Sequence, residues 1–167
     1  MEVYKRHNPF KWTQQQTLNN KAREYYKEKR FDEAEEILLK ALHTNDSNLQ
    51  DLHFVYNSLI QLYYRLRNER YDAIENCIYY CKEDIERLPS FLKGYKREYG
   101  DIPDCPSTKM LIRIYEKDKK YKEAIELCNY AIDLGLEKRF EWYNKQYGKN
   151  KGYKARIVKL QKKLEEG

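Results

Sequence analysis

Two stretches of the chain are near-copies of each other, and this internal repeat constrains the fold more than any other feature. Residues 73–79 read Ala-Ile-Glu-Asn-Cys-Ile-Tyr, and residues 124–130 read Ala-Ile-Glu-Leu-Cys-Asn-Tyr. A second similar pair, residues 59–63 and 111–115, precedes them. A repeat unit cannot bury its apolar face alone, so the pattern predicts stacked units that share one continuous core. It also favours binding over chemistry as the function.

The composition favours helices over strands. Only 6 Gly and 4 Pro occur among 167 residues, which disfavours a turn-rich β architecture. Although 36% of the residues are charged and the mean hydropathy is −1.04, 17 Tyr and 5 Phe supply large apolar surfaces that disordered chains lack. We therefore expect an all-α protein with one domain over residues 13–167, preceded by an N-terminal extension over residues 1–12.

Capping motifs mark where the predicted helices begin. The sequences Thr13–Gln16 and Ser47–Gln50 match the capping box, and Asp32 is the expected N-cap of the second helix. Apolar residues then recur at helical spacing. The predicted units are three helix pairs and a final capping helix, over residues 13–45, 47–88, 107–135 and 153–165.

Pro and Gly residues mark where the predicted helices end. Pro89 disfavours helix at the residue before it, so the fourth helix is expected to end at Leu88. Residues 89–106 are expected to form one long connection, with or without a short helix inside it. Gly135 is expected just after the sixth helix, at the position where helices often end in a left-handed residue. A basic loop then leads to the capping helix.

The helix pairs resemble tetratricopeptide repeats. Each has a Tyr late in its first helix, a Phe or Tyr before its second, an early Ala in the second, and a medium-sized apolar residue four positions later. The aligned residues are Tyr25, Tyr63 and Tyr115; Phe31, Tyr71 and Tyr121; Ala34, Ala73 and Ala124; and Leu38, Cys77 and Cys128. The aligned Ala residues lie 39 and then 51 positions apart, so the repeats are longer than the roughly 34 residues of the family. The resemblance implies an all-α α-solenoid of three irregular helix pairs with a C-terminal capping helix.

Each predicted first helix carries a stripe of polar and basic residues along one face, at i, i+4 and i+8. The nine residues are Asn19, Arg23 and Lys27; Asn57, Gln61 and Arg65; and Lys109, Arg113 and Lys117. The resemblance implies that first helices line a concave groove in which such side chains bind the carboxylates of an extended peptide. We therefore expect a non-catalytic module that binds an acidic or carboxylate-bearing segment of another protein. An ordinary solvated face is the alternative interpretation of the same stripes.

The net charge of +6 comes from the end of the chain, because residues 137–167 hold ten Lys or Arg against four Glu. The basic residues there include Lys145, Lys149, Lys151, Lys154, Arg156, Lys159, Lys162 and Lys163. Tyr143, Tyr147 and Tyr153 lie among them, as stacking on nucleic-acid bases would require. A nucleic-acid-associated protein is therefore one alternative function, and a self-associating structural module is another. A solvating cap with a Lys-rich outer side explains the same residues without a ligand.

The sequence predicts neither an enzyme nor a metal or cofactor site. No nucleophile, base and orienting residue occur together in a recognisable pattern. Cys77 and Cys81 have an i, i+4 spacing that can hold a metal, but Cys77 aligns with Leu38 and is expected in the core. The N-terminus lacks the apolar run of a signal peptide, and the most apolar stretch, residues 54–64, is too short to span a bilayer. We expect a cytoplasmic protein.

Overall fold

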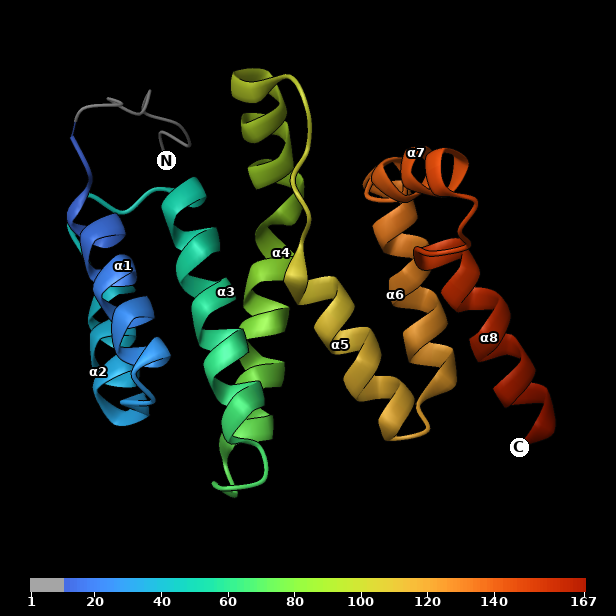
Figure 1. The fold of residues 1–167 in the computed structure, drawn as a ribbon, viewed down its shortest axis with the longest axis horizontal. Coiled ribbons are helices and arrows are strands. Elements are labelled where there is room, and N and C mark those ends of the chain that lie inside the picture. Colours follow the sequence, from blue (N-terminus) through green and yellow to red (C-terminus); the bar gives the residue numbers. More distant parts are fainter. Residues whose placement is uncertain (1–10) are drawn as a thin grey trace. The chain divides into compact units, whose positions relative to one another are not determined.

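The computed structural model describes residues 11–167, and that part of the chain is all-α (Figure 1). It forms eight helices and, within those residues, no strand. The helices are α1 (Gln14–Lys27), α2 (Phe31–Ala41), α3 (Leu49–Leu66), α4 (Ala73–Tyr99), α5 (Pro106–Lys117), α6 (Tyr121–Asp133), α7 (Lys138–Tyr147) and α8 (Tyr153–Glu166). The extension predicted for residues 1–12 lies outside the described residues, except for Lys11 and Trp12.

The helices pack as neighbouring pairs, α1 with α2, α3 with α4, and α5 with α6. Helix α3 also packs on both α1 and α2, and α8 packs on α6. The prediction of an all-α fold built from helix pairs, with a further helix at the C-terminal end, is therefore confirmed. Among residues 11–167, none of the helices is both long enough and apolar enough to cross a membrane.

The aligned positions of the internal repeat are buried to the same degree. All are Ala, Leu or Cys residues on the second helix of a pair, and none is more than 2% exposed. They are Ala34, Ala73 and Ala124, and four residues later Leu38, Cys77 and Cys128. A small side chain at the first position lets the neighbouring helix approach closely. The near-copies in the sequence are therefore packed core segments.

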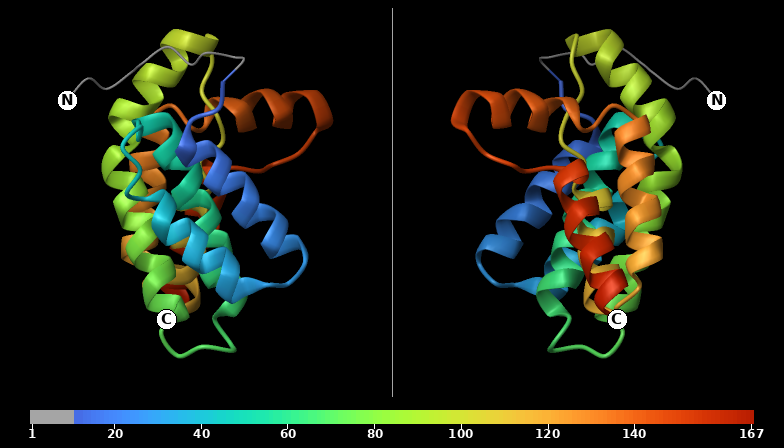
Figure 2. Two further views of the ribbon diagram at one scale, coloured as in Figure 1. Left: turned by 90° about the vertical axis from the view of Figure 1, so that its left-hand side faces the viewer. Right: turned by 90° about the vertical axis from the view of Figure 1, so that its right-hand side faces the viewer.

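The predicted basic loop before the last helix contains a helix of its own. Helix α7 begins at Lys138, ends at Tyr147 and is followed by Gly148 in the left-handed region, with φ of 59°. Figure 2 shows α7 running crosswise to α6 and α8. None of its residues is buried, so it lacks the regularly spaced core-facing residues that reveal helices in a sequence. The end of α6 was predicted correctly, since Gly135 follows it with φ of 87°.

The helix starts agree with the sequence in part. The capping box at Thr13 is confirmed, because its side chain accepts a hydrogen bond from the Gln16 N–H and the Gln16 side chain accepts one from the Thr13 N–H. Helix α3 is capped by Asn48 and not by Ser47. Asp32 lies inside the first turn of α2 and does not cap it. At α3 the neighbouring polar residue Asn48 takes the cap position, whereas α2 begins after Arg30 without a side-chain cap.

Thr13 also ties two helices together, since its Oγ1 donates to Asp51 Oδ2 at 2.7 Å. Thr13→Ala removes both the cap and this bond, and is expected to lower the free energy of unfolding by about 1–2 kcal/mol. Urea denaturation followed by circular dichroism measures the change. Thr17→Ala is the matched control, because the Thr17 hydroxyl donates to the Thr13 carbonyl at 3.0 Å and, among residues 11–167, to no other helix. Equal effects of the two substitutions would contradict the assignment.

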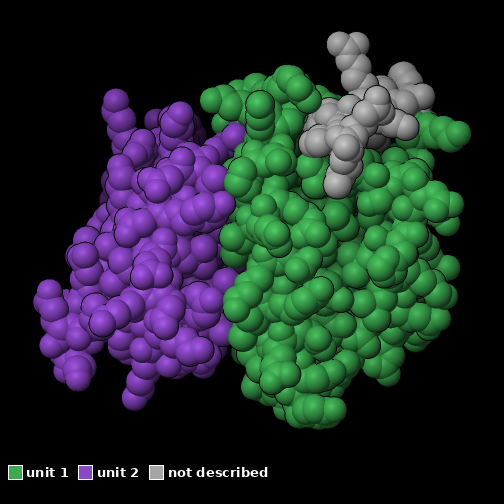
Figure 3. Space-filling view, turned by 180° about the vertical axis from the view of Figure 1, so that it is seen from behind, with its two compact units in different colours: residues 1–101 green, residues 102–167 purple. Residues whose placement is uncertain are grey.

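The chain divides into two compact units, coloured separately in Figure 3. Unit 1 ends at Asp101 and contains α1 to α4, and unit 2 runs from Ile102 to Gly167 and contains α5 to α8.

Helix α4 of unit 1 does not end at Leu88 as predicted. It continues through Pro89 to Tyr99. Pro89 is exposed, while Phe91 and Leu92 beyond it are only 2% and 5% exposed. An internal proline costs about 3 kcal/mol, and burying two large apolar side chains contributes a similar or larger amount. The apolar face therefore continues across the proline, and the long connection expected from residue 89 is wrong.

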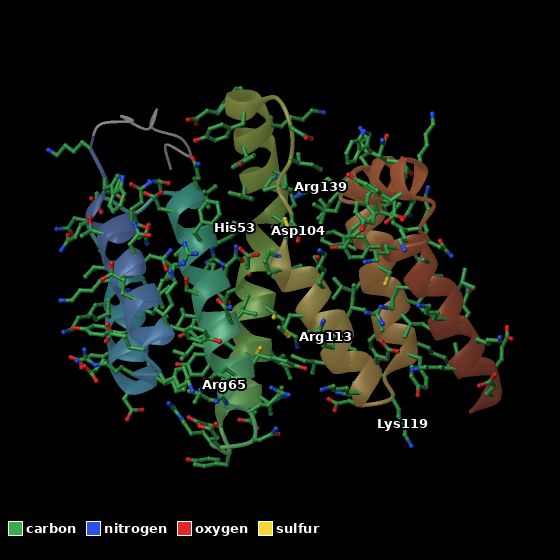
Figure 4. The ribbon with its side chains drawn as sticks, viewed as in Figure 1. His53, Arg65, Asp104, Arg113, Lys119 and Arg139 are labelled. Carbon is green, nitrogen blue, oxygen red and sulfur yellow. The ribbon has the colours of Figure 1, made fainter. Side chains whose placement is uncertain are left out.

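A buried cluster holds α3 against both sides of Pro89. His53 Nδ1 lies 2.7 Å from Asp84 Oδ1, and each side chain is 2% exposed. The His53 ring stacks on Phe91, with centroids 3.9 Å apart and an angle of 18° between the planes. Figure 4 labels His53 on α3 beside α4. Asp84 precedes the proline and Phe91 follows it. The His53 side chain of α3 therefore contacts α4 on both sides of Pro89.

Candidate functional site

The nine residues predicted to bind a peptide fall into two groups. Six lie on α1 and α3 of unit 1, and three lie on α5 of unit 2. The first group is Asn19, Arg23, Lys27, Asn57, Gln61 and Arg65, and the second is Lys109, Arg113 and Lys117. Each group forms part of a different pocket.

A partly buried hydrogen bond between side chains joins α1 to α3. Ser58 Oγ donates to Asn19 Oδ1 at 2.6 Å, and Asn19 is only 7% exposed. Asn19 is therefore not a surface ligand, which corrects its predicted role. Arg23 lies one turn beyond Asn19 on α1, and Gln61 lies one turn beyond Ser58 on α3. Residues one turn apart lie on the same face of a helix. The hydrogen bond between Asn19 and Ser58 therefore places Arg23 and Gln61 next to each other, and both line one pocket.

Arg23, Lys27 and Gln61 line a pocket of about 200 Å³ in unit 1, which we call the unit 1 pocket. Its other lining residues come from α1, α2 and α3 and include no Asp or Glu. They are Ala22, Tyr26, Ala34, Leu38 and Ser58. The Ala and Leu side chains are at most 2% exposed, so the floor is apolar and tightly packed. Pockets for drug-sized ligands usually measure about 300–1,000 Å³, so this one suits a single side chain.

The donors around the unit 1 pocket are unoccupied. Within residues 11–167, Arg23, Lys27 and Gln61 form no ion pair and no hydrogen bond through their side chains. The ring of Tyr26 lies edge-on to Phe31 with centroids 5.4 Å apart, which holds one wall of the pocket in place. Two cations and an amide over an apolar floor favour an entering carboxylate.

The other two predicted residues of unit 1 have partners elsewhere. Asn57 Nδ2 lies 3.2 Å from His53 Nε2 and belongs to the buried cluster. Arg65 pairs with Glu69 at 2.7 Å and lies over the Phe31 ring, 5.3 Å from its centroid. Figure 4 labels Arg65 near the C-terminal end of α3. Neither side chain lines the unit 1 pocket.

Lys109 and Arg113 line a second pocket, of about 430 Å³, which we call the unit 2 pocket. Lys117 does not line it. The cationic residues of the unit 2 pocket are Lys109, Arg113, Lys151, Arg156 and Lys159, and its other residues are Ile112, Phe140, Asn150, Gly152, Tyr153 and Ala155. The sequence assigned two of these cations to a peptide groove and three to a separate basic end, and the fold brings them together. Phe140 was missed because it lies on the unpredicted helix α7.

Lys109 and Arg156 of the unit 2 pocket have acidic partners within unit 2. Lys109 Nζ lies 2.7 Å from Asp104 Oδ2, and Arg156 pairs with Glu116 at 2.9 Å. Lys159 forms no ion pair among the residues that the structure describes. No Asp or Glu lines the pocket itself. The unit 2 pocket therefore presents an excess of positive charge.

The N-terminus of α8, at the edge of the unit 2 pocket, is already capped from within the chain. The Glu137 carboxylate accepts the N–H of Tyr153 at 2.8 Å and that of Lys154 at 3.4 Å, and Glu137 is 5% exposed. An anion in the pocket must therefore be bound by side chains and not by the helix end. The Tyr153 hydroxyl lies 2.7 Å from Thr108 Oγ1, and burial raises the pKa of Tyr153 above its ordinary value.

The cysteines belong to the packed core. Cys77, Cys81, Cys105 and Cys128 are all buried, and none of them forms a disulfide among the described residues. Burial raises the pKa of Cys128 to about 12, so this thiol is protonated near neutral pH and packs as a small apolar group. In the described part of the chain, no three His, Cys, Asp or Glu residues are grouped so that they could hold a metal ion.

Comparisons of the chain with protein-family models, curated proteins and solved structures gave no match. The resemblance to tetratricopeptide repeats therefore depends on the aligned residues alone.

Proposed function

We propose that the protein is a non-catalytic interaction module that binds an acidic or carboxylate-bearing segment of another protein, and that the unit 1 pocket takes one carboxylate of that segment. The observation that carries this proposal is a set of three donors around an apolar floor, Arg23, Lys27 and Gln61, whose side chains have no partner among residues 11–167. A carboxylate there accepts charge-assisted hydrogen bonds, worth about 1.5–3 kcal/mol each before solvent screening.

The size and rigidity of the pocket support a side chain or a chain terminus as its occupant. A volume of about 200 Å³ accommodates a Glu or Asp side chain or a C-terminal carboxylate. The hydrogen bond between Asn19 and Ser58 joins the two helices that carry the donors, so little ordering of the backbone opposes binding.

Reversing the charge of the donors tests the proposal. The double substitution Arg23→Glu and Lys27→Glu is expected to weaken binding of a fluorescein-labelled Asp/Glu decapeptide by at least about tenfold in fluorescence polarisation. Both side chains are exposed, so the fold is expected to persist. The amidated form of the same peptide shows whether the terminal carboxylate contributes.

The matched control is Lys82→Glu with Lys93→Glu, which changes the net charge equally on exposed positions of α4 in the same unit. This control is expected to change the affinity by less than about twofold once salt screens distant charges. If the control weakens binding as much as the pocket variant, the effect is one of overall charge and the unit 1 pocket is not the site.

A further inference from the structure

The excess positive charge of the protein belongs to unit 2. Residues 102–167 hold 16 Lys or Arg against 10 Asp or Glu, whereas residues 1–101 hold 17 of each. A surface with one sign of charge attracts polyanions before any specific contact forms. Unit 2 therefore has an electrostatic preference that unit 1 lacks.

Helix α7 presents aromatic rings to solvent. Trp142 is 64% exposed and Tyr147 is 57% exposed. The two ring centroids lie 6.3 Å apart in an edge-on arrangement, and the Tyr143 ring lies 4.9 Å from that of Tyr147. We call these three residues the aromatic platform. The Tyr143 ring is half-buried and lies against Tyr147, whereas the Trp142 and Tyr147 rings are exposed and available for a planar ligand to stack on.

Lys151 connects the aromatic platform with the unit 2 pocket. Its ammonium lies 5.5 Å from the centroid of the Tyr143 ring, and the same side chain lines the pocket. Two hydrogen bonds of 2.7 and 2.9 Å join the Asn144 side chain to the Lys151 backbone and fix the loop on α7. The cations and the exposed rings are therefore neighbours on one surface of unit 2.

We propose that this surface binds single-stranded nucleic acid, with phosphates at the cations of the unit 2 pocket and an unpaired base stacked on the aromatic platform. A single strand carries both phosphates and unpaired planar bases. The phosphates match the cations of the unit 2 pocket, and the bases match the aromatic platform. An acidic peptide has carboxylates but no planar base for the rings, and a duplex keeps its bases stacked on each other. A volume of about 430 Å³ lies within the range of pockets that hold small molecules, so it accommodates a nucleotide.

Binding of this kind is strongly dependent on salt and tolerant of sequence. If three cations of the unit 2 pocket contact phosphates, raising the salt from about 50 to about 200 mM is expected to weaken binding roughly twentyfold. The stacked base adds a contribution that salt does not remove, and alanine in place of the stacking ring is expected to weaken binding by about 5- to 150-fold.

The tryptophans make the contact directly observable. The chain has 2 Trp, so Trp12→Phe leaves Trp142 as the single tryptophan. Titration of this variant with oligothymidylate or oligouridylate of about twelve nucleotides is expected to quench the Trp142 fluorescence, because a base stacks on the ring. An abasic oligomer with the same phosphates is expected to bind more weakly and to leave the fluorescence unchanged. Quenching by either the DNA or the RNA oligomer supports the proposal, and the stronger ligand identifies the preferred sugar.

Two pairs of variants locate the site. Trp142→Ala is compared with Tyr130→Ala, which removes an exposed ring of α6 in the same unit. The double variant Lys151→Glu/Lys159→Glu changes two cations of the pocket. It is compared with the double variant Lys119→Glu/Lys122→Glu, which changes the net charge equally at exposed positions outside the pocket. Only the first member of each pair is expected to lose binding, and circular dichroism checks that all four variants are folded.

Three results would overturn the proposal. One is no binding of either oligonucleotide at low salt. Another is equal affinity for the abasic oligomer without quenching, which indicates attraction to any polyanion. The third is that the Asp/Glu decapeptide binds more tightly than the oligonucleotides and that the double variant Lys151→Glu/Lys159→Glu loses this binding. This surface would then be a second peptide site. The proposal does not depend on the unit 1 pocket, so it and the proposed function stand or fail separately.

Discussion

Gly152→Ala is expected to lower the free energy of unfolding of unit 2 by about 3–5 kcal/mol. Gly152 has φ of 112° and ψ of −169°, a backbone region that is essentially restricted to glycine and costs other residues about 1–3 kcal/mol. An added Cβ would lie 2.7 Å from Phe140 Cβ and 2.8 Å from both carboxylate oxygens of Glu137. Glu137 would have to move, and its bonds to the start of α8, each worth about 1.5–3 kcal/mol, would weaken.

Urea denaturation of the variant measures this loss, and hydrogen exchange of the α6 and α8 amides assigns it to unit 2. Gly148→Ala is the matched control. Gly148 also has a positive φ, of 59°, but nothing lies within 4 Å of a Cβ placed there, so only the left-handed backbone cost of about 1–2 kcal/mol is expected. Equal losses in the two variants would show that Glu137 adapts freely and that its cap contributes little.

Phe91→Ala is expected to lower the stability of unit 1 by about 3–5 kcal/mol, the usual cost of truncating a buried Phe. The loss is expected to be greatest in the part of α4 beyond Pro89. Proline interrupts the hydrogen-bond ladder of the helix there, and the stacking of Phe91 on His53 compensates for it.

Hydrogen exchange of residues 90–99 measures the local effect, and urea denaturation measures the overall one. Tyr79→Ala provides the comparison, because Tyr79 is a 56% exposed ring on the same helix. Its replacement is expected to change stability by less than about 1 kcal/mol. Unchanged protection of residues 90–99 in Phe91→Ala would mean that the helix crosses the proline without this contact.

The paired helices were predictable because their core positions follow a simple rule. Ala34, Ala73 and Ala124 recur with an apolar residue four positions later, and burial of this face does not depend on the details of the partner helix. The extension of α4 was not predictable from Pro89, because the cost of a proline is local whereas its compensation by His53 comes from a distant segment. Helix α7 was missed for the opposite reason, since it has no buried face to leave a pattern.

The candidate site was predictable as a set of residues and not as an arrangement. The spacing of Arg23 and Lys27 places both on one face of α1, as expected. Gln61 lies beside them because of the hydrogen bond between Asn19 and Ser58, two residues 39 positions apart in the chain. No local pattern reveals such a bond, although a small polar residue in line with the basic stripe is compatible with it. One stripe therefore combines the buried residue Asn19 with the exposed residues Arg23 and Lys27.

The carboxylate of Glu137 also affects how well unit 2 tolerates substitutions. Glu137 lies just before α7 and bonds to the start of α8 just after the loop, so it joins the two ends of the segment that α7 and the loop form between them. The packing of α8 on α6 then needs little from the residues in between. Substitutions along the exposed face of α7 are therefore expected to change the free energy of unfolding of unit 2 very little. This segment can acquire a new binding preference while α6 and α8 keep their packing.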